Sequence, residues 1–153
     1  MPRPNVREIY ERIRPYVEQY AGEYYGGSQE KGFRHWAFHE KFLEHDLSDT
    51  DIIDKTTIDG SDDFEVDGYH IEDAEEEKVI HLFQSKFRSP GTNIGSNELS
   101  PFLEAPAKVL SPEMVASCHN EETKTLHDNL VKLVPLGYVL HLTWVTTGTL
   151  SHQ

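Results

Sequence analysis

Apolar residues recur at helical spacing at the start of the chain. Within residues 5–20, polar residues separate the apolar positions Val6, Ile9, Tyr10, Ile13, Val17 and Tyr20. This period predicts an amphipathic helix that packs one side on a core. Residues 21–32, "AGEYYGGSQEKG", are rich in glycine and predict a loop.

Residues 33–47, "FRHWAFHEKFLEHDL", predict a second helix. At about 100° per residue its apolar side is formed by Phe33, Trp36, Ala37, Leu43 and Leu47. Glu40 falls in the middle of this side, where a carboxylate is costly unless it is paired. Two interpretations follow: Glu40 forms an ion pair with an Arg or Lys, or it binds a cation.

Alternating apolar and polar positions over 66–72 and 79–87 predict two strands of a β-hairpin. The stretch between them, "DAEEEK", predicts a solvated turn. The preceding residues 48–65 are acidic and rich in turn residues, with "KTTI" as one short β-type run.

The remaining pattern is less regular. Residues 89–113, which contain Pro90, Pro101, Pro106 and Pro112, predict an irregular connection or lid. Residues 112–133 predict a helix that begins at Pro112. Residues 136–147, "LGYVLHLTWVTT", are almost continuously apolar and are typical of a central strand covered on both faces.

Helices before and after a sheet indicate an α/β or α+β layer fold. The 153 residues suit one domain, 1–153, with a helical lead-in over 5–47 and a sheet core over 66–147. Because the chain ends directly after its strongest strand, we expect it to be the N-terminal part of a longer protein whose C-terminal domains are absent from this chain.

Charge argues against a partner that is a polyanion. The chain carries 27 acidic and 14 basic residues, a formal net charge of −13, and phosphate binding draws on Lys and Arg. The single Cys118 permits neither an internal disulfide nor a cysteine metal cage, which suits a reducing compartment. The first predicted helix is charged and no apolar run reaches membrane-spanning length. We therefore expect a cytoplasmic protein with no membrane partner.

The hairpin turn sets a register that brings polar residues together. Centring the turn within 73–78 pairs Asp67 with Gln84, Tyr69 with Leu82 and Ile71 with Ile80. Lys86 projects from the same face as Gln84 and meets Glu65, because strand side chains alternate with period two. We expect Asp67, Gln84 and Lys86 to converge at one end of one sheet face.

This group has the chemistry for phosphodiester hydrolysis. Asp67, Gln84 and the main-chain carbonyl of Ser85 offer oxygen ligands to a divalent cation, and Lys86 can hold the attacking water. A structural explanation competes with this one. Asp67 and Gly68 can form a turn, Lys86 can protect a strand end, and Gln84 can be an ordinary polar face residue.

The segment 66–87, "VDGYHIEDAEEEKVIHLFQSKF", resembles the core hairpin of the PD-(D/E)xK nuclease superfamily. It is most similar to the branch found at the N-terminus of abortive-infection phage-resistance proteins and in Mrr-like restriction endonucleases. That branch carries Asp-Gly before aromatic and aliphatic residues, then a charged turn and an apolar strand ending in Gln-x-Lys. Around the hairpin, "FRHWAFHEKFLEHDL", "DTDIIDKTTIDGSDD" and "GYVLHLTWVTTG" resemble neighbouring segments of the branch, so the likeness spans about 33–147 and is specific at 66–87.

The resemblance implies an α/β fold of the restriction-endonuclease type, with a mixed central sheet of about four strands flanked by helices. It also implies one or two Mg²⁺ ions, or Mn²⁺, and hydrolysis of DNA or RNA. Asp67 matches the metal-binding acid, Gln84 stands where most members have Asp or Glu, and Lys86 matches the catalytic lysine. Glu40 matches the glutamate that many members add from the preceding helix, with Glu44 as second choice.

The chain departs from the branch just before Asp67. The branch often reads Gly-Gly-Ile-Asp-Gly before the first core strand, where this chain has "DDFEVDG". The neutral Gln84 also removes one negative charge, so we expect weaker metal binding than at a site with two acids.

Other clusters favour ordinary structural roles. His35 and His39 have a helical spacing that zinc sites use, but no third ligand is evident, and surface histidines are the favoured interpretation. The acidic residues of 59–65 lack the spacing of an EF-hand and favour a solvated loop. Cys118 has no partner that marks it as a nucleophile. Basic residues that can contact phosphates are Arg88, Lys108, Lys124 and Lys132.

The leading hypothesis is therefore a metal-dependent endonuclease that acts on DNA more than RNA, in restriction or phage defence, with a homodimer as one form of assembly. The alternative is an inactive nuclease-like scaffold that binds nucleic acid or a protein partner, which the charge of −13 and Gln84 favour. A third interpretation is an α/β interaction domain with an incidental motif.

Overall fold

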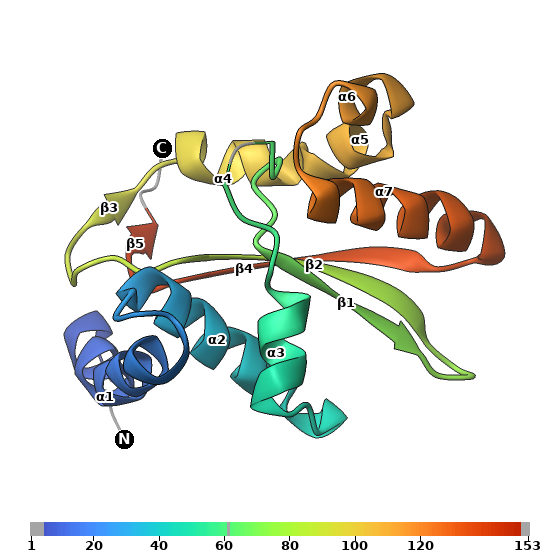
Figure 1. The fold of residues 1–153 in the computed structure, drawn as a ribbon. Helices are drawn as coiled ribbons and strands as arrows, with labels where there is room; N and C mark the ends of the chain where they lie inside the picture. Colours follow the sequence, from blue (N-terminus) through green and yellow to red (C-terminus); the bar gives the residue numbers. More distant parts are fainter. Residues whose placement is uncertain (1–4, 61, 151–153) are drawn as a thin grey trace. The chain divides into compact units, whose positions relative to one another are not determined.

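A computed structural model describes residues 5–60 and 62–150 of the chain. Its elements, in order (Figure 1), are α1 Val6–Tyr24, α2 Gln29–Lys41, η1 Leu43–His45, α3 Asp49–Lys55, β1 Gly68–Asp73, β2 Lys78–Lys86, β3 Asn93–Ile94, α4 Ser96–Leu103, α5 Ala105–Leu110, α6 Pro112–Ala116, α7 Glu121–Leu133, η2 Val134–Leu136, β4 Val139–Thr146 and β5 Thr149–Leu150. None of the helices in the described ranges has the length and apolar character needed to cross a membrane. The fold is mixed α/β, with a three-stranded sheet flanked by helices.

The chain divides into two compact units. The first comprises Met1–Ile53, Ser85–Glu98 and Trp144–Gln153, and the second comprises Asp54–Gln84 and Leu99–Thr143. Strands β2 and β4 contribute residues to both units, because the divisions fall within them.

In the first unit, α1 and α2 pack closely because Gly32 has no side chain. A Cβ atom at Gly32 would lie 2.3 Å from the main-chain oxygen of Val17. The Ser28 side chain caps α2 by accepting from the Lys31 N–H at 3.4 Å. The predicted loop over 21–32 is therefore wrong at both ends, since α1 continues to Tyr24 and α2 already begins at Gln29.

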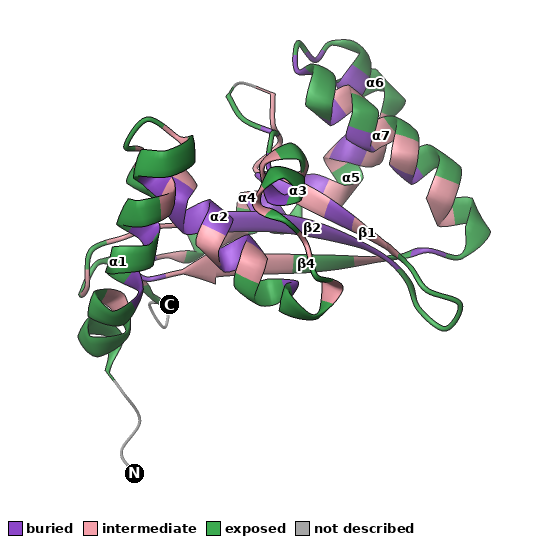
Figure 2. Ribbon diagram, turned by 60° about the horizontal axis from the view of Figure 1, so that its bottom comes forward, coloured by how far each residue is buried: buried purple, intermediate pink, exposed green. Residues whose placement is uncertain are grey.

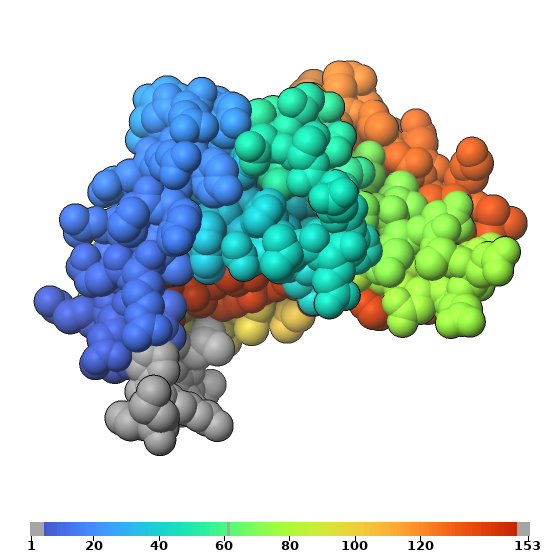
Figure 3. Space-filling view, turned by 90° about the horizontal axis from the view of Figure 1, so that it is seen from below, coloured from blue at the N-terminus to red at the C-terminus, as the bar shows by residue number. Residues whose placement is uncertain are grey.

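In the second unit, β1 and β2 form the predicted hairpin. Tyr69 pairs with Leu82 and Ile71 with Ile80, which confirms the predicted register. Main-chain hydrogen bonds between Ala74 and Glu77, of 3.0 and 3.2 Å, close the turn, and the hairpin tip is exposed (Figures 2 and 3).

Helix α7 packs against this hairpin. Its buried positions are Thr123, Leu126 and Leu130, at the helical spacing of one face. On the same helix, Asn129 Nδ2 donates to the hydroxyl of Tyr69 in β1 at 3.2 Å. The predicted helix over 112–133 is interrupted, because α6 ends at Ala116 and α7 starts after the cap residue Asn120.

The strand order of the main sheet is β1-β2-β4, so β2 is central. Residues 79–85 of β2 are all buried (Figure 2). Lys78 Nζ lies 5.7 Å from the Tyr138 ring centroid, and Thr146 Oγ1 donates to the Lys86 carbonyl at 2.8 Å, so β4 runs parallel to β2.

The interpretation of 136–147 as a central, doubly covered strand is wrong. Strand β4 lies at the sheet edge, and Val139 is 55% exposed. In the described chain the main sheet has three strands where about four are predicted, and β3 and β5 form a separate parallel pair.

Two segments predicted as irregular contain helices. Residues 48–65 include α3, and "KTTI" forms no strand. Residues 89–113 include α4, α5 and the start of α6, as well as β3. Short helices containing proline and acidic residues resemble turns in a single sequence, because Pro, Asp and Ser favour both turns and helix starts.

Candidate functional site

Asp67 and Gln84 lie at the buried base of the hairpin. The Asp67 N–H donates to the Phe83 carbonyl at 2.8 Å, which extends the β1–β2 ladder by one residue. Asp67 is 9% exposed and Gln84 is 2% exposed. Two polar side chains are therefore held in a mostly apolar sheet interior.

Gly68 belongs to strand β1, and the competing interpretation of Asp67-Gly68 as a turn is wrong. The hairpin turn lies at the other end of β1, between Ala74 and Glu77. A Cβ atom at Gly68 would lie 2.6 Å from the Lys55 main-chain oxygen and 2.9 Å from the Thr56 Cα. Gly68 is thus required where the chain after α3 crosses β1.

Glu65 contacts Gln84. The amide Nε2 of Gln84 donates to Glu65 Oε2 at 2.9 Å, in a partly buried setting. The sequence placed Glu65 opposite Lys86 and did not include it among the site residues. No signal in the sequence could have found this contact, because Phe64 and Glu65 adopt a left-handed φ that neither residue type favours.

The backbone before Asp67 is left-handed at residues that are not glycine. Phe64 has φ 52° and Glu65 has φ 66°. Left-handed φ costs an L-residue roughly 1–2 kcal/mol, so this turn forms without the residue type that favours it.

Asp63 stabilises this turn. Its carboxylate Oδ1 accepts from the Glu65 N–H at 2.9 Å, and its main-chain oxygen accepts from the Val66 N–H at 3.0 Å. The turn delivers Val66, which is fully buried, and then Asp67 into the sheet.

The start of α7 anchors the acidic loop that precedes the turn. Thr123 Oγ1 donates to the Asp62 main-chain oxygen at 2.9 Å, and the His119 N–H donates to Asp62 Oδ2 at 2.9 Å. Asn120 Nδ2 donates to the Asp59 carbonyl at 3.0 Å. These hydrogen bonds hold the acidic loop against the start of α7, whereas the sequence predicts a solvated loop. Cys118, 4% exposed, lies beside it and packs as a buried residue.

Ser85 and Lys86 end strand β2. Ser85 is 6% exposed, and Lys86 is of intermediate exposure. The Lys86 main-chain oxygen accepts from Thr146 Oγ1 at 2.8 Å and from the Thr147 N–H at 3.3 Å. The Lys86 backbone is thus fixed by the end of β4.

Glu40 does not lie on a buried apolar face, so that argument for its role is wrong. The buried residues of α2 are Gly32, Phe33, Arg34, His35, Ala37 and Phe38. The Glu40 side chain is 49% exposed and lies 3.4 Å from His39 Nδ1. The helix ends at Lys41, and Glu44 lies exposed in η1. Both glutamates belong to the first unit, and their assignment as ligands stays a prediction.

Asp67, Gln84 and Ser85 carry oxygen atoms of the types that a hard cation accepts. A carboxylate oxygen, an amide oxygen and a main-chain carbonyl are the ligand types that Mg²⁺ and Mn²⁺ accept. In residues 5–60 and 62–150, no three His, Cys, Asp or Glu side chains are grouped so that they could hold a metal ion. A cation at this place would therefore depend on Asp67 together with neutral oxygens.

His35 is a buried structural residue, which corrects its interpretation as a surface histidine. Its side chain is 0% exposed, with Nε2 2.9 Å from Asp49 Oδ1 and Nδ1 2.8 Å from the Tyr25 hydroxyl. Burial lowers the pKa of His35, although the hydrogen bond to Asp49 opposes this shift. Neutral His35 therefore donates from Nε2 to Asp49 and accepts from Tyr25 at Nδ1, which leaves neither nitrogen for zinc.

The basic residues named as phosphate contacts are mostly paired with acids. Arg88 contacts Glu30 at 3.1 Å and Glu98 at 3.2 Å. Lys108 lies 3.8 Å from Glu104, and Lys124 lies 3.4 Å from Glu121. Lys132 is exposed. These pairs lower the positive potential that a phosphate would meet.

A cavity of about 400 Å³ opens beside Tyr69 and Ile71, on the face of β1 that also carries Asp67. Its other lining residues are Asp54, Lys55, Thr57, Glu121, Glu122 and Thr125. Burial raises the pKa of Tyr69, so its phenol stays protonated at neutral pH. The cavity combines one aromatic ring with more acidic than basic groups.

Comparison with known proteins adds no assignment: no family model, no curated protein and no solved structure matched the chain.

Proposed function

We propose that the chain is a divalent-metal-dependent nuclease domain of the PD-(D/E)xK type. It would hydrolyse phosphodiester bonds, in DNA more than in RNA, in restriction or phage defence. One observation carries this proposal: Asp67 and Gln84 are both buried, and the strand register sets them opposite each other at the base of the hairpin. Lys86 lies two residues beyond Gln84 on the same strand.

Each residue has a separate role in this proposal. Asp67, Gln84 and the Ser85 carbonyl would hold the ion, with Glu40, or Glu44 as the alternative, assigned by resemblance only. A bound Mg²⁺ or Mn²⁺ would polarise a phosphoryl oxygen and lower the pKa of water. The Lys86 ammonium would orient the attacking water and offset charge on the phosphate.

The proposal includes a restriction-endonuclease-like fold with a main sheet of about four strands. An antiparallel hairpin joined by a helical crossover to a parallel third strand supports this part.

The test is a cleavage assay on plasmid, single-stranded DNA and RNA with Mg²⁺ or Mn²⁺. We expect metal-dependent cleavage that EDTA stops. We expect Lys86→Ala to lower the cleavage rate by about 10²-fold or more, since proton transfer and charge stabilisation contribute rate factors of this size. Asp67→Asn is expected to abolish the metal-dependent cleavage, because it removes the metal-binding carboxylate.

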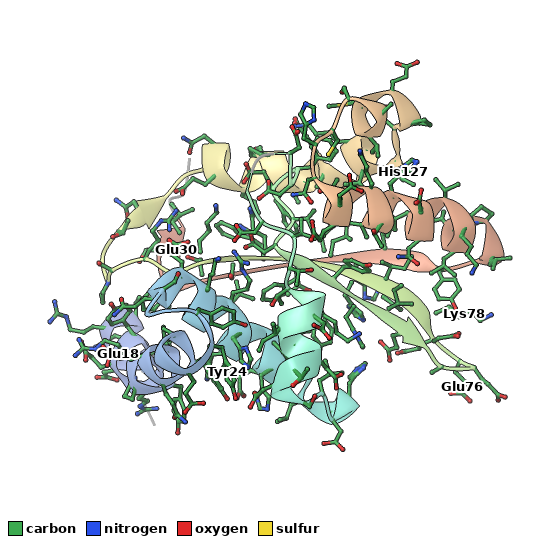
Figure 4. The ribbon with its side chains drawn as sticks, in the orientation of Figure 1. Glu18, Tyr24, Glu30, Glu76, Lys78 and His127 are labelled. Atoms are coloured by element: carbon green, nitrogen blue, oxygen red, sulfur yellow. The ribbon has the colours of Figure 1, made fainter. Side chains whose placement is uncertain are left out.

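Lys78→Ala is the matched control, because it removes the same charge from the exposed start of β2 (Figure 4). The Lys78 ammonium lies over the Tyr138 ring. We expect it to cut like the wild type. No cleavage of any substrate, or equal rates in Lys86→Ala and Lys78→Ala, would contradict the proposal.

The second candidate function is a scaffold that binds a partner without cutting. The net charge of −13 and the neutral Gln84 favour it. Calorimetric titration with Mn²⁺ separates the two functions. If the chain is a nuclease, Mn²⁺ gives a heat of binding in the wild type that Asp67→Asn removes. If it is a scaffold, neither the wild type nor Asp67→Asn gives a heat of binding.

A further inference from the structure

The contact between Glu65 and Gln84 deepens the proposed function and rests on it. Gln84 is 2% exposed, so its amide is removed from bulk water, and its Nε2 donates to Glu65 Oε2 at 2.9 Å. A buried amide needs a hydrogen-bonding partner, and a carboxylate is a strong acceptor for it.

This bond determines which end of the amide faces away from Glu65. A carboxylate accepts hydrogen bonds only, so it attracts the amide nitrogen and repels the amide oxygen. With Nε2 directed at Glu65, Oε1 is the end of the Gln84 amide that faces away from the Glu65 carboxylate. Without Glu65, nothing in this contact would distinguish the two ends.

The same bond places a negative charge next to position 84. Most members of the similar superfamily carry that charge on the residue at position 84 itself. Here the charge resides on Glu65, one hydrogen bond away, while Gln84 supplies a neutral oxygen. The two residues together hold one carboxylate and one oriented oxygen donor.

We propose that Glu65 is a positioning residue for the candidate metal site, and that Glu65 and Gln84 act as one unit in place of a second acid. Glu65 orients the amide and supplies the charge, and Gln84 supplies the oxygen donor. Partners that orient a metal ligand typically change metal affinity by about 10–100-fold when they are removed.

The experiment is Mn²⁺ titration calorimetry on the full chain, with thermal unfolding to verify that each variant folds. Glu65→Gln keeps the side-chain size and removes the charge, and we expect it to bind Mn²⁺ about 10-fold or more weakly than the wild type. Glu76→Gln is the matched control, because Glu76 lies exposed in the hairpin turn and its loss changes the net charge equally (Figure 4). Glu76→Gln is expected to bind like the wild type.

An exchange variant provides the decisive comparison. Glu65→Gln combined with Gln84→Glu restores the amide–carboxylate pair with its partners interchanged, and we expect it to recover most of the affinity lost in Glu65→Gln. A purely structural hydrogen bond predicts no loss of affinity in Glu65→Gln once the protein is folded.

The outcomes separate this inference from the proposed function. Asp67-dependent Mn²⁺ binding that Glu65→Gln leaves unchanged, or an exchange variant as weak as Glu65→Gln, overturns the inference alone. Absence of Mn²⁺ heat in the wild type overturns both. A loss in Glu65→Gln with recovery in the exchange variant supports both.

Discussion

At the residue scale, Gly68 determines how closely the chain after α3 can approach β1. Its hydrogen faces the Lys55 carbonyl and the Thr56 backbone, neither of which is the end of a flexible side chain. A methyl group at this position therefore has to displace backbone. Since Asp67 precedes Gly68 directly, any such displacement also moves the candidate site.

We expect Gly68→Ala to destabilise the protein by about 1–3 kcal/mol, the range found for overpacked positions. Gly22→Ala is the control, because a Cβ at Gly22 meets nothing within 4 Å inside α1. That change should stabilise the helix by about 1 kcal/mol, the difference between Gly and Ala in a helix interior. Urea unfolding measures both, and equal effects in the two variants would contradict the role given to Gly68.

His35 couples stability to pH. The pKa of His35 is lowered by burial, so protonation favours the unfolded chain. The pKa of Asp49 is lowered by its hydrogen bond to His35, so protonation of Asp49 also favours unfolding. Tyr20 and Tyr24 (the latter labelled in Figure 4) also pack on the His35 ring. The Tyr24 hydroxyl donates to Asp49 Oδ2 at 3.1 Å.

We expect the free energy of unfolding to fall as pH drops below about 6.5, the ordinary pKa of histidine, and to fall again below about 3.9, that of aspartate. His35→Gln should reduce the first of these decreases, because it removes the buried histidine whose pKa is lowered. His119→Gln, at an exposed position, should leave the profile unchanged. An identical pH profile for His35→Gln and the wild type would refute this account of His35.

Reasoning from the sequence predicted the correct strand register for Asp67 and Gln84, but it misjudged the surroundings of Glu40 and Glu65. The first pair follows from strand alternation, which needs only the turn position. The Glu40 argument required the helix to continue beyond Lys41, whereas Asp46 adopts a left-handed φ of 52° and the helix has already ended. Glu65 depends on left-handed backbone at Phe64 and Glu65, for which neither residue type gives a signal.

At the element scale, the hairpin was predictable because its signals are local. Its turn residues and its period-two pattern lie within 20 consecutive residues or so, and both indicate the same register. Helix α2 was misjudged at its start, because Gly32 serves a contact with α1 and does not mark a loop. The edge position of β4 depends on strand order, which an apolar run does not specify.

The contact between α7 and the acidic loop gives a prediction at this scale. Thr123 is fully buried and donates to the Asp62 carbonyl, so Thr123→Val removes a buried hydrogen bond and should cost about 1–3 kcal/mol. Thr125→Val is the control, since the exposed Thr125 hydroxyl donates within its own helix to Glu121. It should change stability by less than about 0.5 kcal/mol. Equal losses in denaturant unfolding would show that the loop is not anchored through Thr123.

At the scale of the whole molecule, charge is the main argument against nucleic acid. The net charge is −13, and three of the four named basic residues already face acids. Binding of DNA by this chain would therefore rely on divalent ions more than on Lys and Arg. This reliance agrees with a metal-dependent activity and disfavours tight, metal-free binding.

The central claim is that the buried base of the β1–β2 hairpin binds a divalent cation. Anomalous diffraction from crystals of the full chain grown with Mn²⁺ tests it most directly. We predict a peak within about 2.0–2.6 Å of an Asp67 carboxylate oxygen and of Gln84 Oε1, the range of metal–oxygen bonds. Crystals that show Mn²⁺ elsewhere, or none at the hairpin base at saturating concentration, would contradict the account.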